Sequence, residues 1–186
     1  MMVSTLPQYV RGKIDASSIT LNERVVFTRR IAKVVKGGRH LRFNALVIVG
    51  DGEGVVGASL GKAMAIPDAV RKGNSMAKKK LIRIPFKGST IPQETSSKKG
   101  AALVLIKPAP PGTGIIASGV IRAVLDMAGV KDAVAKSLGS RNPINVVYAT
   151  LDALQKLKDP ATELAIRKGI SPPMTEPTAK LDDSEL

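Results

Sequence analysis

The 186-residue chain contains no cysteine, no tryptophan and a single histidine, His40. The absence of cysteine excludes disulfides and cysteine metal sites, and one histidine excludes a site built from several histidines of one chain. Aromatic residues make up only 3% of the sequence while 44% is hydrophobic, so the core must be aliphatic. No apolar run reaches the roughly 18 residues of a transmembrane helix, and no signal peptide is evident. The sequence therefore indicates a soluble, intracellular protein without a metal or cofactor.

Acidic residues are also few, since 15 of them face 29 lysines and arginines for a net charge of +14. Residues 1–93 alone carry a net +12, whereas 171–186 carry −3. Between Arg24 and Arg42 there are seven basic residues and no acid. A solvated charged face normally interleaves both signs, so this stretch predicts a phosphate-facing surface. Nucleic acid is the favoured partner and an anionic membrane surface the second.

The sequence shows no set of residues suited to catalysis. The acids are scattered, and His40 has no carboxylate near it in sequence. Gly52–Gly57 matches GxGxxG by letter, but a strand pattern follows it where a dinucleotide loop needs a helix, so a hairpin turn is predicted. Gly57–Ala63 is one residue short of a P-loop. Pro111–Gly119 leads from a loop into a predicted helix, a geometry that can hold phosphate, and keeps a phosphate-loop enzyme open as an alternative.

The first half of the chain predicts a sheet with one helix. Strands are expected over Leu21–Val35, Leu41–Val49 and Val55–Leu60, which are rich in β-branched and apolar residues between glycines. A helix is expected from Pro67, with Gly73 weakening its middle by roughly 1 kcal/mol relative to alanine. Alternation along the second strand places Leu41, Phe43, Ala45, Val47 and Val49 on one face and Arg42 and Asn44 on the other.

The second half predicts alternating strands and helices, and so a compact α+β or α/β layer. Asn142-Pro143 is typical of a helix start, and Gly129 of a helix end. The expected elements are strands over Gly100–Lys107 and Val130–Leu138 and helices over Ile115–Ala128, from Pro143 to about Lys158, and from Pro160 to Gly169.

Several long motifs, in order between about Leu21 and Gly169, resemble the bacterial small-subunit ribosomal protein S5 family. They are Val34–Arg39, Phe43–Gly52, Gly57 with Gly61–Ala63, Lys107–Ala109, Gly112–Ala117, Arg122–Leu125, Ala128–Val130, Ala135-Lys136 with Gly139-Ser140, and Asn142–Val146.

This resemblance implies an α+β fold of two small domains. The first is similar to double-stranded-RNA-binding domains, with a three-stranded antiparallel sheet and a helix, and the second has a βαβ arrangement. The resemblance further implies a cytoplasmic, non-enzymatic component of the small ribosomal subunit that binds ribosomal RNA. It implies neighbours S4 and S8, and a link to decoding accuracy and to the channel through which messenger RNA enters. The loop Lys36–Arg39 would lie near the spectinomycin site, and Gly112–Ile116 near the contact with S4.

Five segments are expected: an N-terminal arm over 1–20, the double-stranded-RNA-binding-like domain over 21–84, a linker over 85–97, the C-terminal domain over 98–169 and an acidic, disordered tail over 170–186. A free-standing double-stranded-RNA-binding regulator is a further alternative function. The predicted RNA-binding residues are Arg24, Arg29, Arg30, Lys33, Lys36, Gly37, Gly38, Arg39, His40, Arg42, Lys62, Arg71, Lys72, Lys78, Lys79 and Lys80. The predicted protein-contact residues are Gly112, Thr113, Gly114, Ile115 and Ile116.

Overall fold

The computed structural model describes residues 19–168, so the predicted tail and almost all of the predicted N-terminal arm lie outside the described residues. The elements are β1 (Asn22–Val35), β2 (Gly38–Gly50), β3 (Val55–Ala63), α1 (Ile66–Ala77), β4 (Ile82–Arg83), β5 (Thr95–Lys99), β6 (Ala102–Pro108), β7 (Ile115–Ile116), α2 (Gly119–Ala128), β8 (Ala133–Gly139), α3 (Pro143–Gln155) and α4 (Pro160–Arg167).

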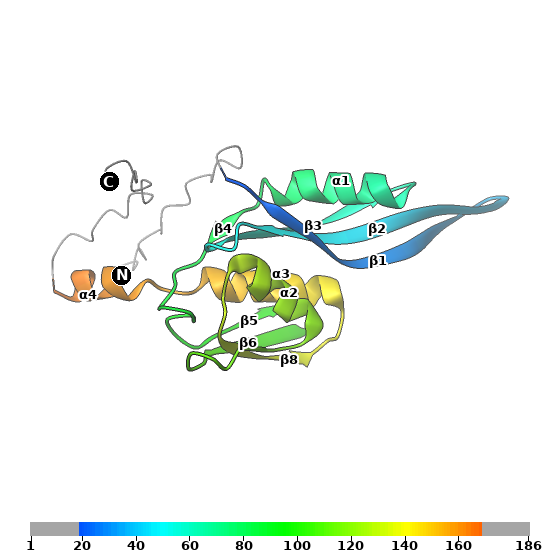
Figure 1. Cartoon of the computed structure of the whole chain (residues 1–186). Coiled ribbons are helices and arrows are strands. Elements are labelled where there is room, and N and C mark those ends of the chain that lie inside the picture. The colour runs from blue at the N-terminus through cyan, green and yellow to red at the C-terminus, as the bar shows by residue number, and fades with distance from the viewer. Residues whose placement is uncertain (1–18, 169–186) are drawn as a thin grey trace, which may run out of the picture.

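The elements stack in four layers, which Figure 1 shows from top to bottom. Helix α1 lies on one face of an antiparallel sheet of order β1-β2-β3-β4. Helices α2 and α3 lie beneath that sheet, and a mixed sheet of order β5-β6-β8-β7 lies beneath the helices. The hairpin of β1 and β2 extends beyond α1 and beyond the lower layers. We call this projecting part of the hairpin the arm; it is distinct from the predicted N-terminal arm over 1–20. The α+β prediction is confirmed, with β4 added to the three strands expected for the first sheet.

Helix α1 packs closely on β3 because glycines face each other at the contact. A Cβ atom at Gly61 would overlap the carbonyl oxygen of Ala69, and one at Gly73 would lie 2.8 Å from Cγ2 of Val47. Gly73 is a buried residue of α1. The predicted loss of helix propensity at Gly73 therefore comes with a packing role that the sequence did not reveal, since only a residue without a side chain lets the two backbones approach this closely.

Both faces of β2 are covered over its second half, which the sequence did not predict. Ala45, Val47 and Val49 pack with α1, while Leu46 and Ile48 belong to a larger core that contains residues of α2 and α3. The prediction of one open face therefore fails where the lower helices cover the sheet. The open face exists only in the arm, beyond the reach of those helices.

The turn between β2 and β3 docks on the C-terminal end of α2. The N–H groups of Gly52 and Gly54 donate hydrogen bonds to the carbonyl oxygens of Met127 (3.2 Å) and Ala128 (3.0 Å). A helix leaves its last carbonyls without partners inside the helix, so this turn supplies the missing donors. A Cβ atom on Gly129 would overlap the carbonyl oxygen of Gly52. The GxGxxG letters thus belong to a hairpin turn, as predicted, and this turn joins the two halves of the chain.

Two predictions for the second half need correction. Helix α2 begins at Gly119 rather than Ile115, because Ile115 and Ile116 form the short strand β7 parallel to β8. The predicted linker contains the start of β5, whose Thr95 Oγ1 is buried and donates to the carbonyl oxygen of Ala153 at 3.0 Å. A hydroxyl-rich segment resembles a loop in sequence, but here its hydroxyls are satisfied inside the fold.

The predicted helix boundaries at Asn142 and Gly129 are confirmed. The Asn142 side chain accepts a hydrogen bond from the N–H of Ile144 at 3.3 Å, and Pro143 is the first residue of α3. Gly129 follows α2 with φ of 87°, in the left-handed region that glycine adopts without strain.

Candidate nucleic-acid interface

The register of the arm sorts the predicted basic residues onto two faces. Arg29 pairs with Asn44, which pairs with Lys62, and the adjoining pairs are Ile31 with Arg42 and Lys33 with His40. Directly paired residues point to the same face of a sheet, and so do residues two apart on one strand. One face of the arm, together with the end of β3 beside it, therefore carries Arg29, Lys33, His40, Arg42 and Lys62, and we call this surface the arm face.

The arm face lies on the side of the sheet opposite α1, the side to which Leu46 and Ile48 also point. The side chains of its four cations and of His40 are all exposed. Arg29 is held over the ring of Phe27, with 5.2 Å between the guanidinium carbon and the ring centroid. None of the four cations forms an ion pair with another residue of the range 19–168. The arm face is thus a surface of unneutralised positive charge, as phosphate binding requires.

The opposite face of the arm is chemically different. Arg30 and Arg39 point to the side of α1, where their neighbours are the exposed apolar residues Val34 (73% exposed) and Leu41 (48%). The tip is formed by Lys36, Gly37 and Gly38, and Gly37 has φ of 89°. A Cβ atom at either glycine would meet nothing within 4 Å, so the tip backbone is open to an approaching group.

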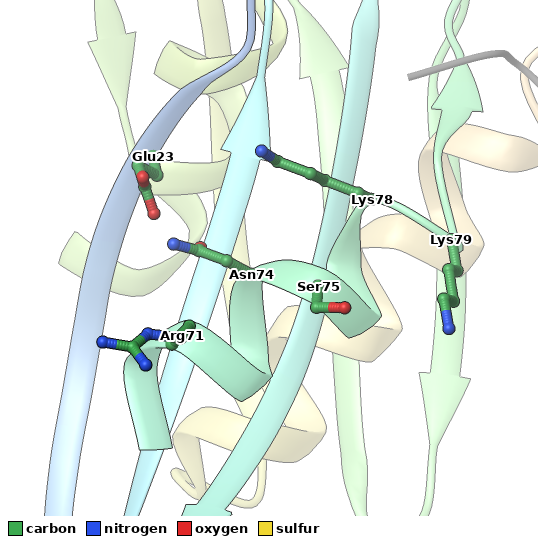
Figure 2. A pocket seen from close by; sticks show the side chains of 6 residues that line it. All are labelled: Glu23, Arg71, Asn74, Ser75, Lys78 and Lys79. Carbon is green, nitrogen blue, oxygen red and sulfur yellow. The ribbon is translucent and has the colours of Figure 1, made fainter. Parts of the chain in front are cut away.

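Helix α1 brings the remaining predicted cations to a groove beside β1. The helix covers β2 and β3 but scarcely reaches β1, and the open groove of about 490 Å³ that results is lined by Glu23, Arg71, Asn74, Ser75, Lys78 and Lys79 (Figure 2). We call it the α1–β1 groove. Lys72 and Lys80 are exposed but do not line it. Arg24 differs from the other predicted residues, because its guanidinium is paired with the Asp126 carboxylate of α2 at 3.1 Å.

A buried carboxylate accepts a hydrogen bond from the backbone of the predicted protein-contact loop, Gly112–Ile116. Asp132 is 5% exposed, and its Oδ1 accepts a hydrogen bond from the N–H of Gly114 at 2.9 Å. The Ser89 hydroxyl and this N–H, with smaller contributions from the N–H groups of Gly112 and Thr113, lower the pKa of Asp132 below 3.8, and burial opposes them in part. Ile116 remains 55% exposed above this support. The loop therefore presents an apolar side chain from a fixed backbone.

Neither a metal-binding cluster nor a membrane-spanning helix is present among the described residues. Among residues 19–168, no three His, Cys, Asp or Glu side chains gather closely enough to hold a metal ion. None of the helices in that range combines the length and apolarity that crossing a bilayer needs.

Comparison with protein-family models finds two matches. Residues 21–85 match the model for ribosomal protein S5, N-terminal domain, and residues 97–168 match the model for ribosomal protein S5, C-terminal domain. The chain belongs to the ribosomal protein S5 family.

Membership of the S5 family assigns the chain to the small ribosomal subunit as a structural protein that binds ribosomal RNA in translation. The expectation of a non-enzymatic protein is confirmed, and the phosphate-loop enzyme is excluded. Pro111–Gly119 also lacks the expected geometry, because β7 interrupts the loop before α2 begins.

Sequence reasoning missed three polar groups of this S5-family chain. Asp132 follows Lys131 in a stretch without a turn or motif signal, and nothing in the sequence distinguishes it from a surface acid. Asn44 is 7% exposed, and its Oδ1 has no hydrogen-bond partner within residues 19–168. Glu23 faces the α1–β1 groove, which no local pattern predicts because the groove joins elements nearly fifty residues apart.

Proposed function

We propose that the arm face and the α1–β1 groove are the surfaces with which the chain binds ribosomal RNA phosphate. The observation that carries this proposal is the arm face, where Arg29, Lys33, Arg42 and Lys62 stand together without a counter-ion among the described residues. Arg29 and Lys33 are four residues apart on β1, or about 13 Å along the strand, so several phosphates can be contacted at once. Lys36 and Arg39 extend the same function to the tip.

Arg24 takes a different part in this proposal. Its ion pair with Asp126 joins β1 to α2, and both side chains are about half exposed. An exposed ion pair contributes little stability, so Arg24 can still exchange its carboxylate for a phosphate. The predicted residues Arg30, Lys72 and Lys80 surround the two surfaces and add to the field that attracts RNA.

Partners beyond ribosomal RNA are proposed from the family resemblance and from the protein-contact loop. We propose S4 as the partner of Gly112–Ile116, because Ile116 offers exposed apolar surface on a backbone fixed by Asp132. S8 and messenger RNA near its channel are the other proposed neighbours, and a contribution to decoding accuracy is the proposed consequence. The domain division at 21–84 and 98–169 stays a proposal as well.

The test removes charge from the arm face and compares it with the same change elsewhere. Arg42→Gln with Lys62→Gln is matched by Lys98→Gln with Lys136→Gln, two exposed lysines of the second sheet without ion pairs among residues 19–168. Affinity for small-subunit ribosomal RNA is measured at several salt concentrations. The arm-face pair should weaken binding and lower the salt slope by about two units, one for each lost phosphate contact.

The control pair should leave the slope within about half a unit of wild type. Equal losses for the two pairs would mean that RNA responds to net charge alone, and an unchanged slope for the arm-face pair would remove the arm face from the interface. Thermal unfolding of each variant checks that the fold is retained.

A further inference from the structure

The α1–β1 groove contains a carboxylate, which a simple phosphate site would not. Glu23 is exposed on β1, and it pairs with Val49, whose side chain packs under α1, so Glu23 points to the helix side. Figure 2 shows it facing Asn74 and Arg71, with Lys78 reaching toward it from the end of the helix. Neither Glu23, Arg71 nor Lys78 forms an ion pair within 4.0 Å in the part of the chain that the structure describes.

The helix side of this groove adds to its negative potential. The C-terminal end of a helix carries partial negative charge, and Asn74 to Lys78 form that end of α1. The groove therefore presents the Glu23 carboxylate as an acceptor beside cations at Arg71 and Lys78. A ligand that fits must combine negative charge with a hydrogen-bond donor.

The backbone of RNA has this combination in every residue. Each phosphate is followed by a ribose whose 2′-hydroxyl donates a hydrogen bond, and this hydroxyl distinguishes RNA from DNA. A volume of about 490 Å³ lies within the range of sites that hold a small ligand or one unit of a polymer. The Lys79 side chain points away from Glu23 in Figure 2 and takes no part in the combination.

We propose that the α1–β1 groove is a ribose–phosphate subsite for RNA, in which Arg71 and Lys78 bind a backbone phosphate and the Glu23 carboxylate accepts a hydrogen bond from an adjacent 2′-hydroxyl. This assignment rests on the proposed role of α1 in RNA binding and adds selectivity for ribose. The Glu23 carboxylate weakens the binding of a phosphate alone. A 2′-hydroxyl that donates a hydrogen bond to this carboxylate strengthens the binding of the ribose–phosphate unit.

The experiment scans the 2′-hydroxyls of a small-subunit ribosomal RNA fragment. The fragment is the segment that the full-length protein protects from hydroxyl-radical cleavage, made with a single 2′-deoxy substitution at each position in turn. With the wild-type protein, one position should lose affinity about three- to ten-fold, the loss of one hydrogen bond of ordinary net strength. Glu23→Leu should abolish the loss at that position, whereas Glu23→Gln, which keeps a carbonyl acceptor, should retain it.

Arg71→Gln provides the control, because it should weaken the all-ribose and the 2′-deoxy RNA by the same factor. Thermal unfolding confirms that the variants are folded, and Glu23→Ala, which also removes the acceptor at this exposed position, replaces the leucine variant if that variant is unstable. A wild-type protein that is indifferent to every 2′-deoxy substitution, or an unchanged loss with Glu23→Leu, would overturn the subsite while RNA binding stood. Failure of the wild-type protein to bind the RNA at all would instead refute the proposed function.

Discussion

Replacing Gly61 by alanine tests whether close backbone contact fixes α1 on the sheet. The new Cβ atom would overlap the carbonyl oxygen of Ala69 and approach the N–H of Gly73, so α1 must move away from β3. Overpacking of this kind costs about 1–3 kcal/mol. For a chain of this size, each kcal/mol lowers the melting temperature by about 2–4 °C. The expected fall is therefore about 2–12 °C, measured by calorimetry or circular dichroism.

The matched control makes the same chemical change at Gly119. That residue is the first of α2, and a Cβ atom there would meet nothing within 4 Å. Because alanine is the better helix former, Gly119→Ala should leave the melting temperature unchanged or raise it slightly. Gly73→Ala extends the test: helix propensity favours it by about 1 kcal/mol, and contact with the stiff Val47 side chain opposes it. A stabilised Gly73→Ala or an unaffected Gly61→Ala would refute the argument that these glycines exist for close packing.

Two further predictions concern the protein-contact loop. The pKa of Asp132 is lowered in the folded protein, so ionised Asp132 contributes stability above pH 3.8 that is lost as the pH falls through the folded pKa. The chemical shift of the Gly114 amide in nuclear magnetic resonance should therefore change on acidification with a midpoint below pH 3.8. A Gly114 amide shift that does not change with pH in the wild type would contradict this. Ile116→Asp should abolish binding of purified S4, whereas Leu164→Asp, at an equally exposed residue (55%) on α4, should not, as measured by co-purification; equal losses would remove the loop from that contact.

Local signals decided which parts of the fold were predictable. The cap at Asn142 and the end at Gly129 depend on residues next to one another, and both were predicted correctly. Three of the four strands of the first sheet, β1 to β3, followed from β-branched residues between glycines. The basic residues of the arm were identified from charge alone, but the register was needed to show that Arg29 and Arg30 point to opposite faces.

Features that depend on contacts between distant segments were not predictable. Ile115 and Ile116 continue a helical apolar pattern, and only pairing with β8 makes them a strand. Leu46 and Ile48 share the face of β2 on which alternation placed Arg42 and Asn44, and nothing local indicated that a second layer of helices covers them. The residues that line the α1–β1 groove come from β1 and from the end of α1, and neither segment alone suggests a site.

Helix α2 fixes the distance between the proposed RNA and protein contacts. It spans ten residues, or about 15 Å. Its N-terminal end follows the loop at Gly112–Ile116, and its C-terminal end accepts hydrogen bonds from Gly52 and Gly54 at the base of the first sheet. Arg24 of β1 is paired with Asp126 on the same helix. A displacement of the loop therefore has a short and continuous path to the strands that carry the arm, whereas the arm, the proposed RNA contact, projects beyond the other layers.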